Sequence, residues 1–268
     1  MKKLLILLFL VPFVFVMMGS SCEDEPTEAI DPPSGLELSG ASDELSLVIS
    51  WTPSSTADID GYRIYYQGDT DPIYEGTNAT YTHGAGTTAP ALGEYEIVAY
   101  RGSEESDALD FDTSDEEYLK SGTFTIYRMD SPIGYDSGVG FNVSTGVAIT
   151  YSMSDAGTNG TLVDIYYDTD GTFTSPDYLG GDWVNQSGFK SSSETYTGLE
   201  VVDLTGYNNS TYPTAVADGQ IWQCVFWKTT TSTWNYAKMR IDGVVTTPET
   251  HVTVTYKYQT IEGWARVD

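Results

Sequence analysis

The sequence predicts an all-β fold of two β-sandwich-like domains in tandem. The chain has 20 tyrosines and 26 glycines, and it is rich in threonine and valine, a composition typical of strands joined by short turns. Apolar and polar residues alternate most regularly over residues 251–259, where Val252, Val254 and Tyr256 share one face. Helical periodicity is almost absent after residue 21. These features predict sheets with one face toward a core and one toward solvent.

The first 21 residues have the layout of a secretory signal peptide. Lys2 and Lys3 precede an apolar run over residues 4–18, and small residues then lead to Cys22. The apolar run has 15 residues, fewer than the roughly 20 that cross a bilayer as a helix, and Pro12 interrupts it. A cleaved signal is therefore favoured over a permanent membrane helix.

Residues 19–22 resemble a bacterial lipobox, with Gly19 where leucine is usual. The resemblance implies cleavage before Cys22, lipid attachment to Cys22, and a place in the cell envelope, with the outer membrane as the expected partner. An ordinary secreted protein is the alternative. Residues 22–30 are expected to form an acidic tether. Its acidic start also resembles the surface-export signal of lipoproteins in Bacteroidetes-like bacteria, whereas a plain spacer leaves a periplasmic orientation open.

The net charge limits which partners the chain can bind, and the cysteine content limits how its fold can be stabilised. The formal charge is -27, and removing residues 1–21 takes it to -29, so nucleic acid is excluded as a partner. With Cys22 lipidated, Cys224 has no intramolecular partner, which leaves no disulfide framework. Cys224 lies in an apolar run and is expected to be buried.

The first domain is expected over residues 31–114. Leu45, Leu47, Ile49 and Trp51 alternate onto one face of a strand, and further strands are predicted at 62–66 and 92–100.

The order of these segments resembles a fibronectin type III domain. The positions that carry the resemblance are Trp51, Tyr62 with Ile64, and Leu92 with Tyr95. It implies a β-sandwich in which these side chains belong to the core, with Tyr95 forming a tyrosine corner. Such domains serve as spacers or protein-binding modules, so the fold alone supplies no chemistry.

Acidic residues crowd the end of this domain between residues 103 and 117. An edge strand is expected at 108–113, where the charges would oppose unwanted strand pairing. An interdomain calcium ion is the alternative. Residues 115–121 are expected to be a linker.

The second domain is expected over residues 122–268. The predicted strands lie at 122–127, 146–153, 162–167, 221–228, 234–242 and 251–259. Segments near Phe141, Ile165 and Tyr256 resemble β-rich HmuY-type haem-binding lipoproteins. That family uses histidine or methionine ligands, whereas this domain has only one histidine, His251, and scattered methionines, so no cofactor is expected.

No catalytic or metal-binding constellation is expected, and the chain is interpreted as a non-enzyme. His83 and His251 lie in different domains without a second ligand at metal-binding spacing. Ser144 lacks the context of a nucleophile elbow. Asp168 to Gly171 is interpreted as a hairpin turn.

The strand at 234–242 carries the candidate ligand site. Ala237, Met239 and Ile241 are expected to face the core, and the four residues predicted to face outward combine aromatic and cationic side chains suited to a sugar ring or a protein surface. These four residues are Trp234, Tyr236, Lys238 and Arg240. The alternative is a second face covered by a loop or by the first domain. Trp183 and Trp264 are secondary candidates.

Together these features predict a non-catalytic, envelope-anchored lipoprotein that acts as a binding, adhesion or scaffold module, with a protein or a glycan as partner. A carrier of haem or glycan for uptake is the first alternative. A carbohydrate-active enzyme with two unrecognised carboxylates is the second.

Overall fold

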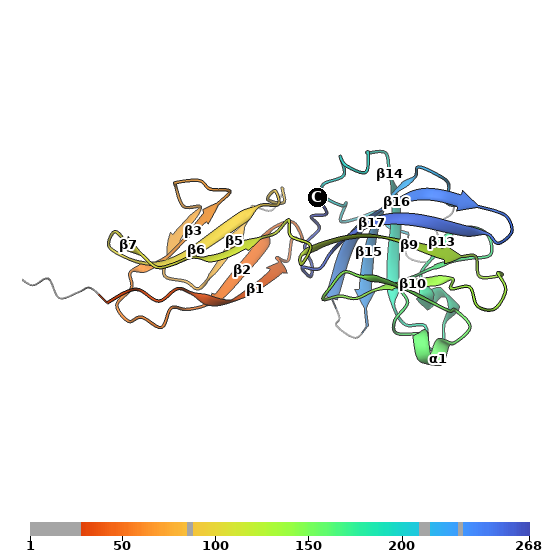
Figure 1. Cartoon of the computed structure of the whole chain (residues 1–268), viewed down its shortest axis with the longest axis horizontal. Helices are drawn as coiled ribbons and strands as arrows, with labels where there is room; N and C mark the ends of the chain where they lie inside the picture. The colour runs from red at the N-terminus through yellow and green to blue at the C-terminus, as the bar shows by residue number, and fades with distance from the viewer. Residues whose placement is uncertain (1–27, 85–87, 209–214, 230–232) are drawn as a thin grey trace, which may run out of the picture.

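The chain is all-β. The computed structural model describes residues 28–84, 88–208, 215–229 and 233–268, and every strand pairing in them is antiparallel. Two groups of sheets lie end to end along the long axis (Figure 1). Cys22, the expected signal peptide and most of the expected tether lie outside the described residues. Within those described, no helix has the length and apolar character needed to cross a bilayer.

The first group is a sandwich of two sheets. One sheet has the order β1 (Ser34–Gly40), β2 (Leu47–Thr52), β5 (Thr80–His83). The other has the order β4 (Tyr74–Gly76), β3 (Gly61–Tyr66), β6 (Glu94–Arg101), β7 (Glu104–Glu105), and β8 (Leu109–Asp112) also pairs with β6. Leu47, Ile49 and Trp51 from the first sheet meet Ile64 and Tyr95 from the second in one core. The predicted alternation of β2 is therefore confirmed.

The second group is also two sheets. The larger has the order β14 (Gln186–Ser192), β15 (Ile221–Lys228), β16 (Thr233–Val245), β17 (His251–Gln259), β9 (Leu119–Tyr127). The smaller has the order β11 (Ala148–Tyr151), β10 (Gly138–Phe141), β12 (Ile165–Tyr167), β13 (Phe173–Thr174). A short helix α1 (Ala156–Asn159) and a 3-10 turn η1 (Pro176–Leu179) complete it. The core between the sheets includes Cys224, which is buried as predicted.

The strand predictions succeed where alternation is strong. β15 and β17 have the predicted bounds. β9 starts at Leu119, so the last residues of the expected linker already belong to a strand paired with β17. Strands β10, β13 and β14 were not predicted, because segments such as Gln186–Ser192 are rich in serine and glycine, which strands disfavour.

The segment after β17 returns to the first domain and joins the two halves. Trp264 is fully buried in the core of the first domain, and its Nε1 donates to the Leu45 carbonyl at 3.0 Å. The Gly40 amide donates to the Glu262 carbonyl at 2.7 Å. A Cβ on Gly40 would lie 1.9 Å from the Gly263 oxygen, so only glycine allows this approach. The C-terminal segment is thus a structural joint as well as the end of the second domain (Figure 1).

Candidate functional site

A groove of about 360 Å³ lies where the two domains meet, and we call it the junction groove. Its lining combines an acid of the first domain with aromatic and apolar residues of the second. The lining residues are Glu44, Leu204, Thr205, Gly206, Tyr207, Val225, Trp234 and Tyr236. Two of the predicted ligand-binding residues, Trp234 and Tyr236, are therefore brought together here.

Strands β15 and β16 supply the aromatic rim of the junction groove. Trp234 lies directly opposite Trp227 across the two strands, with ring centroids 6.1 Å apart. Trp234 is 39% exposed, which makes it one of the more exposed large apolar side chains in the described residues. The rim therefore presents an indole to solvent on a rigid sheet.

Glu44 brings a carboxylate to the same groove from the turn between β1 and β2. The Asp43 side chain holds this turn by accepting from the Leu45 and Ser46 amides at 3.0 and 2.8 Å. Glu44 has a φ of 58°, a left-handed conformation that is costly for a residue with a side chain. Such strain persists only where the surrounding structure enforces it, and it is concentrated at functional sites.

The Tyr236 hydroxyl donates to the Glu44 carboxylate and so connects the two domains across the groove. Burial, followed by the hydrogen bond to Glu44, raises the pKa of Tyr236, which keeps the phenol neutral and able to donate. The amide of Gly263 donates to the Trp234 carbonyl at 2.7 Å. The C-terminal segment thus fixes the start of β16 beside the groove.

The wall formed by residues 203–207 is anchored to the larger sheet. Lys190 on β14 forms an ion pair with Asp203 at 2.6 Å and donates to the Thr205 carbonyl at 3.2 Å. The Asp203 amide donates to Gln223 Oε1 at 2.5 Å. Burial raises the pKa of Tyr207, whose hydroxyl has no hydrogen-bond partner in the described structure.

Most of the predicted outward face is covered, which corrects the expectation that Tyr236 and Lys238 point to solvent. Tyr236 is only 2% exposed and packs with Leu199 and Val202. Ala237, Met239 and Ile241 face the core as predicted, but Lys238 is 0% exposed. Its Nζ donates to the Leu199 carbonyl at 2.8 Å and to Asp268 Oδ2 at 2.7 Å. The residues around 199–202 and 265–267 lie over this part of the sheet.

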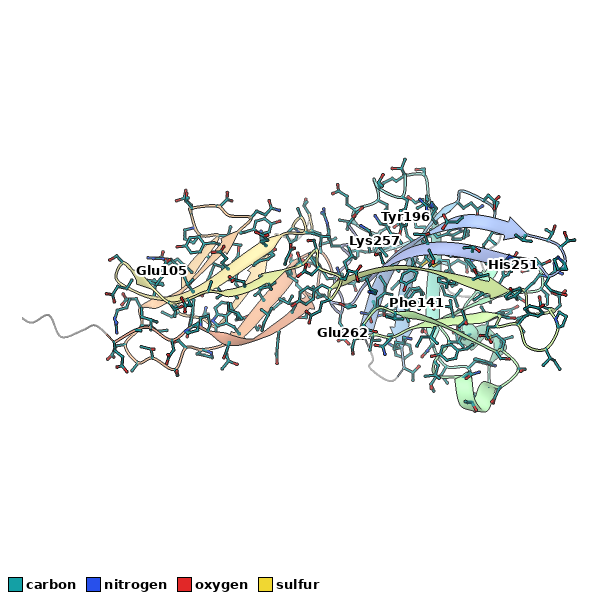
Figure 2. The ribbon with its side chains drawn as sticks, in the orientation of Figure 1. Glu105, Phe141, Tyr196, His251, Lys257 and Glu262 are labelled. Atoms are coloured by element: carbon teal, nitrogen blue, oxygen red, sulfur yellow. The ribbon has the colours of Figure 1, made fainter. Side chains whose placement is uncertain are left out.

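Arg240 remains partly exposed, but it is already engaged. Its guanidinium lies 5.2 Å from the centroid of the Tyr196 ring, and its Nε contacts Asp242 at 2.6 Å. Lys238 Nζ lies 4.9 Å from the same ring. Figure 2 shows Tyr196 and Lys257 toward the junction side of the second domain. Lys238 and Arg240 were expected to contact a ligand. Both instead lie against the ring of Tyr196.

The remaining candidates are structural. Trp183 is buried, and Trp264 forms the joint described above. His251 Nδ1 lies 2.9 Å from the Glu249 carbonyl, toward the far end of the second domain (Figure 2). The Gly171 amide donates to the Asp168 carbonyl at 3.0 Å, which confirms the hairpin turn between β12 and β13.

His83 is half-buried among tyrosines. Its Nδ1 lies 2.8 Å from the Tyr95 hydroxyl, and its ring packs on Tyr66 with centroids 4.8 Å apart. Burial lowers the pKa of His83. In a tyrosine corner the hydroxyl binds the upstream backbone. In the described residues, the Tyr95 hydroxyl instead contacts the side chain of His83.

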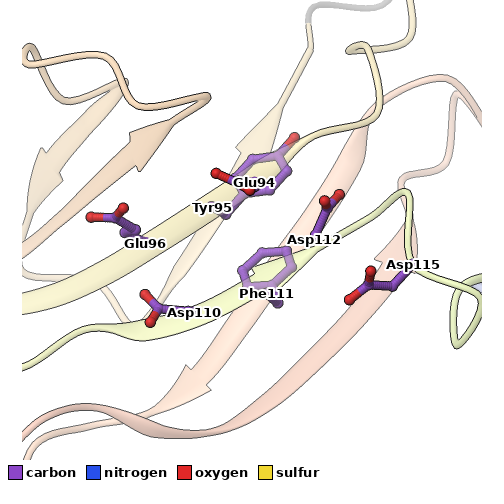
Figure 3. Close-up of a pocket in the computed structure, with 7 residues that line it drawn as sticks. All are labelled: Glu94, Tyr95, Glu96, Asp110, Phe111, Asp112 and Asp115. Atoms are coloured by element: carbon purple, nitrogen blue, oxygen red, sulfur yellow. The ribbon is translucent and has the colours of Figure 1, made fainter.

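A second groove, of about 420 Å³, is acidic and lies on β6 and β8 (Figure 3). Glu94 lies opposite Asp112 and Glu96 opposite Asp110, so two pairs of like charges face each other across the strands. The acidic edge strand predicted at 108–113 includes Asp110 and Asp112, but the prediction missed Glu94 and Glu96, which belong to the neighbouring strand β6. In the part of the chain that the structure describes, no three His, Cys, Asp or Glu residues are grouped to hold a metal ion.

Replacing Asp110 with lysine is expected to stabilise the protein by about 0.5 kcal/mol, because it converts one repulsive cross-strand pair into an attractive one. Urea unfolding at low and high salt measures the effect, which should shrink as salt increases. Asp69→Lys makes the same charge change at an exposed turn position and is the control. An equal gain from both variants would show that net charge, and not the cross-strand pair, is responsible.

Comparison with known protein families finds no family model that matches the chain, and comparison with curated proteins finds no match.

Proposed function

We propose that the chain is a non-catalytic, envelope-anchored lipoprotein that binds a glycan or a protein in the junction groove. The observation that carries the proposal is the exposed Trp234, seated beside Trp227 and facing a groove that also contains the Glu44 carboxylate. The second domain thus supplies the apolar ring of Trp234, and the first domain supplies the Glu44 carboxylate as a hydrogen-bond acceptor.

This combination suits a neutral sugar. The apolar C–H face of a pyranose ring stacks on an indole, and carboxylate oxygens accept hydrogen bonds from its hydroxyl groups. The formal charge of -27 disfavours anionic ligands at the same surface. A protein partner would use the same indole as an anchor, since tryptophan is enriched among residues that dominate binding energy.

The first domain is proposed to be a fibronectin type III-like spacer. A three-stranded sheet β1-β2-β5 that packs on a sheet ordered β4-β3-β6-β7 supports this reading. Placed between an anchor at Cys22 and the groove, such a domain would hold the groove away from the membrane. It also contributes Glu44 directly.

We expect Trp234→Ala to weaken ligand binding by about tenfold, because the stacking surface is lost while the fold is kept. A glycan array on the chain without residues 1–21 identifies the ligand, and calorimetry on the best hit measures the affinity. Tyr178→Ala removes an aromatic side chain that is 61% exposed outside the groove, and it is the matched control.

The alternatives give different results in the same set of experiments. Haem titration with a new Soret band would favour the carrier. Release of reducing sugar from a bound glycan would favour a carbohydrate-active enzyme. If a glycan bound equally well to wild type and Trp234→Ala, the junction groove would be the wrong site. If neither glycan nor haem bound, a protein-binding or scaffold role would remain.

A further inference from the structure

A buried lysine and a buried aspartate meet between the two sheets of the second domain. Lys228 is the last residue of β15 in the larger sheet, and Asp164 directly precedes β12 in the smaller one. Their side chains are 7% and 1% exposed, and Lys228 Nζ contacts Asp164 Oδ2. The two groups therefore connect the halves of the sandwich away from solvent.

Two further donors orient the Asp164 carboxyl group. The Phe141 amide donates to Oδ2 at 2.7 Å, and Asn185 Nδ2 donates to Oδ1 at 3.1 Å. Asn185 is itself fixed, since the two hydrogens on its Nδ2 are shared between Asp164 and the carbonyls of Thr161 and Val163, each 3.0 Å from Nδ2. The Asp164 carboxyl group is thus held in one orientation, with Lys228 Nζ in contact with its Oδ2.

The surroundings are apolar and aromatic. The Phe141 ring lies 5.0 Å from Phe226 and 4.9 Å from Tyr258, and all three side chains belong to the buried core. Burial raises the pKa of Asp164, although Lys228 and the donated hydrogen bonds oppose the rise. A carboxyl group with a raised pKa is more readily protonated, and the protonated form is the one that can lose water.

A buried ion pair alone is a weak source of stability, because desolvation offsets the attraction between the charges. A side-chain nitrogen held against a buried, oriented carboxyl group is, however, the arrangement that amide formation requires. We propose that Lys228 and Asp164 form an intramolecular isopeptide bond that covalently joins the two sheets of the second domain.

The reaction is a condensation that needs no oxidant or cofactor. Lys228 first passes one proton to Asp164 Oδ2. Its Nζ then attacks Asp164 Cγ, so that the new C–N bond forms and the Cγ–Oδ2 bond breaks. Oδ2 leaves as water, with the carboxyl proton and one proton from the amine. Asn185 Nδ2–H faces Oδ1, where negative charge develops in the tetrahedral intermediate, and the Phe141 N–H faces the departing oxygen.

Asn185 is the competing electrophile, and the geometry disfavours it. Attack on its Cγ would place negative charge on Asn185 Oδ1, which is buried without a hydrogen-bond donor in the described structure. Its leaving nitrogen is also held by two backbone carbonyls. Loss of water at Asp164 and loss of ammonia at Asn185 give different product masses, so the two routes can be separated.

Peptide mapping of the denatured, trypsin-digested wild-type protein tests the proposal. We expect a branched peptide in which Lys228 is joined to Asp164, lighter than the two linear peptides together by one water, with no cleavage after Lys228. Lys238, which pairs with the partly exposed Asp268, is the internal control and should remain uncoupled. Linear peptides only, or an ammonia-loss product at Asn185, would overturn the proposal.

Variants add a second readout. Lys228→Arg and Asp164→Ala should each abolish the branched peptide, and Lys228→Arg should lower Tm by about 10 °C, because a cross-link between residues 64 apart restricts the unfolded chain. Should either variant fail to fold, the wild-type map still decides the question. A branched peptide that persisted in Lys228→Arg would contradict the assignment.

Discussion

Trp264→Ala is expected to lower the free energy of unfolding by about 3–5 kcal/mol, the largest loss of any single truncation outside the sheets. The side chain is fully buried in the core of the first domain although it belongs to the C-terminal segment. Its removal leaves a large cavity and also breaks the bond from Nε1 to the Leu45 carbonyl. Urea unfolding followed by tyrosine fluorescence and far-UV circular dichroism measures the loss.

The joint formed by Trp264 should also make unfolding of the two domains cooperative. Wild type is expected to unfold in one transition, whereas Trp264→Ala should show two, because each domain keeps its own core. Trp234→Ala is the control, since this indole is exposed and its loss should cost less than about 1 kcal/mol. Equal losses in the two variants would show that Trp264 does not hold the joint.

Lys238→Ala is expected to destabilise the protein by about 3 kcal/mol, because it leaves a cavity in place of a fully buried side chain and removes that side chain's hydrogen bonds. The truncation leaves the Leu199 carbonyl without its donor and weakens the hold on Asp268. Lys257 contacts the same Asp268 carboxylate but is partly exposed, so Lys257→Ala should cost less than about 1 kcal/mol. Chemical unfolding of both variants at pH 7 makes the comparison.

The pH dependence of this pair follows from the carboxylate. Burial alone would raise the pKa of Asp268, but the hydrogen bonds from Lys238 and Lys257 outweigh it and lower the pKa below 3.8. A carboxyl group with a lowered pKa stabilises the folded state above its unfolded pKa, and this contribution is lost as the pH falls through the folded value. The difference between wild type and Lys238→Ala should therefore be constant from pH 5 to 7 and shrink at more acidic pH. A difference that grew on acidification would contradict this assignment.

The sequence predicts the all-β class and the strands with strong alternation because burial of one sheet face leaves a period-two pattern. It predicts which side of β16 Ala237 and Lys238 occupy, but not that Lys238 is covered. The covering segment near Leu199 and Val202 has no regular periodicity, and its contact with β16 is made only in the folded chain.

The junction groove could be predicted only in part, because some of its residues come together only in the folded chain. Trp234 and Tyr236 share one strand, so alternation places them together. Their partner Glu44 lies 192 residues away from Tyr236 in the sequence, and no local pattern connects the two. The strained turn at Glu44 and the return of the C-terminal segment to the first domain become visible only in the three-dimensional structure.

We propose that the junction groove is presented from a lipid anchor at Cys22. Labelling with a radioactive fatty acid followed by cell fractionation tests this anchor. Wild type is expected to carry the label and to remain with the membrane fraction. Cys22→Ala should carry no label and should leave that fraction. Unlabelled wild-type protein in the soluble fraction or the medium would contradict the claim and would leave a secreted β-protein.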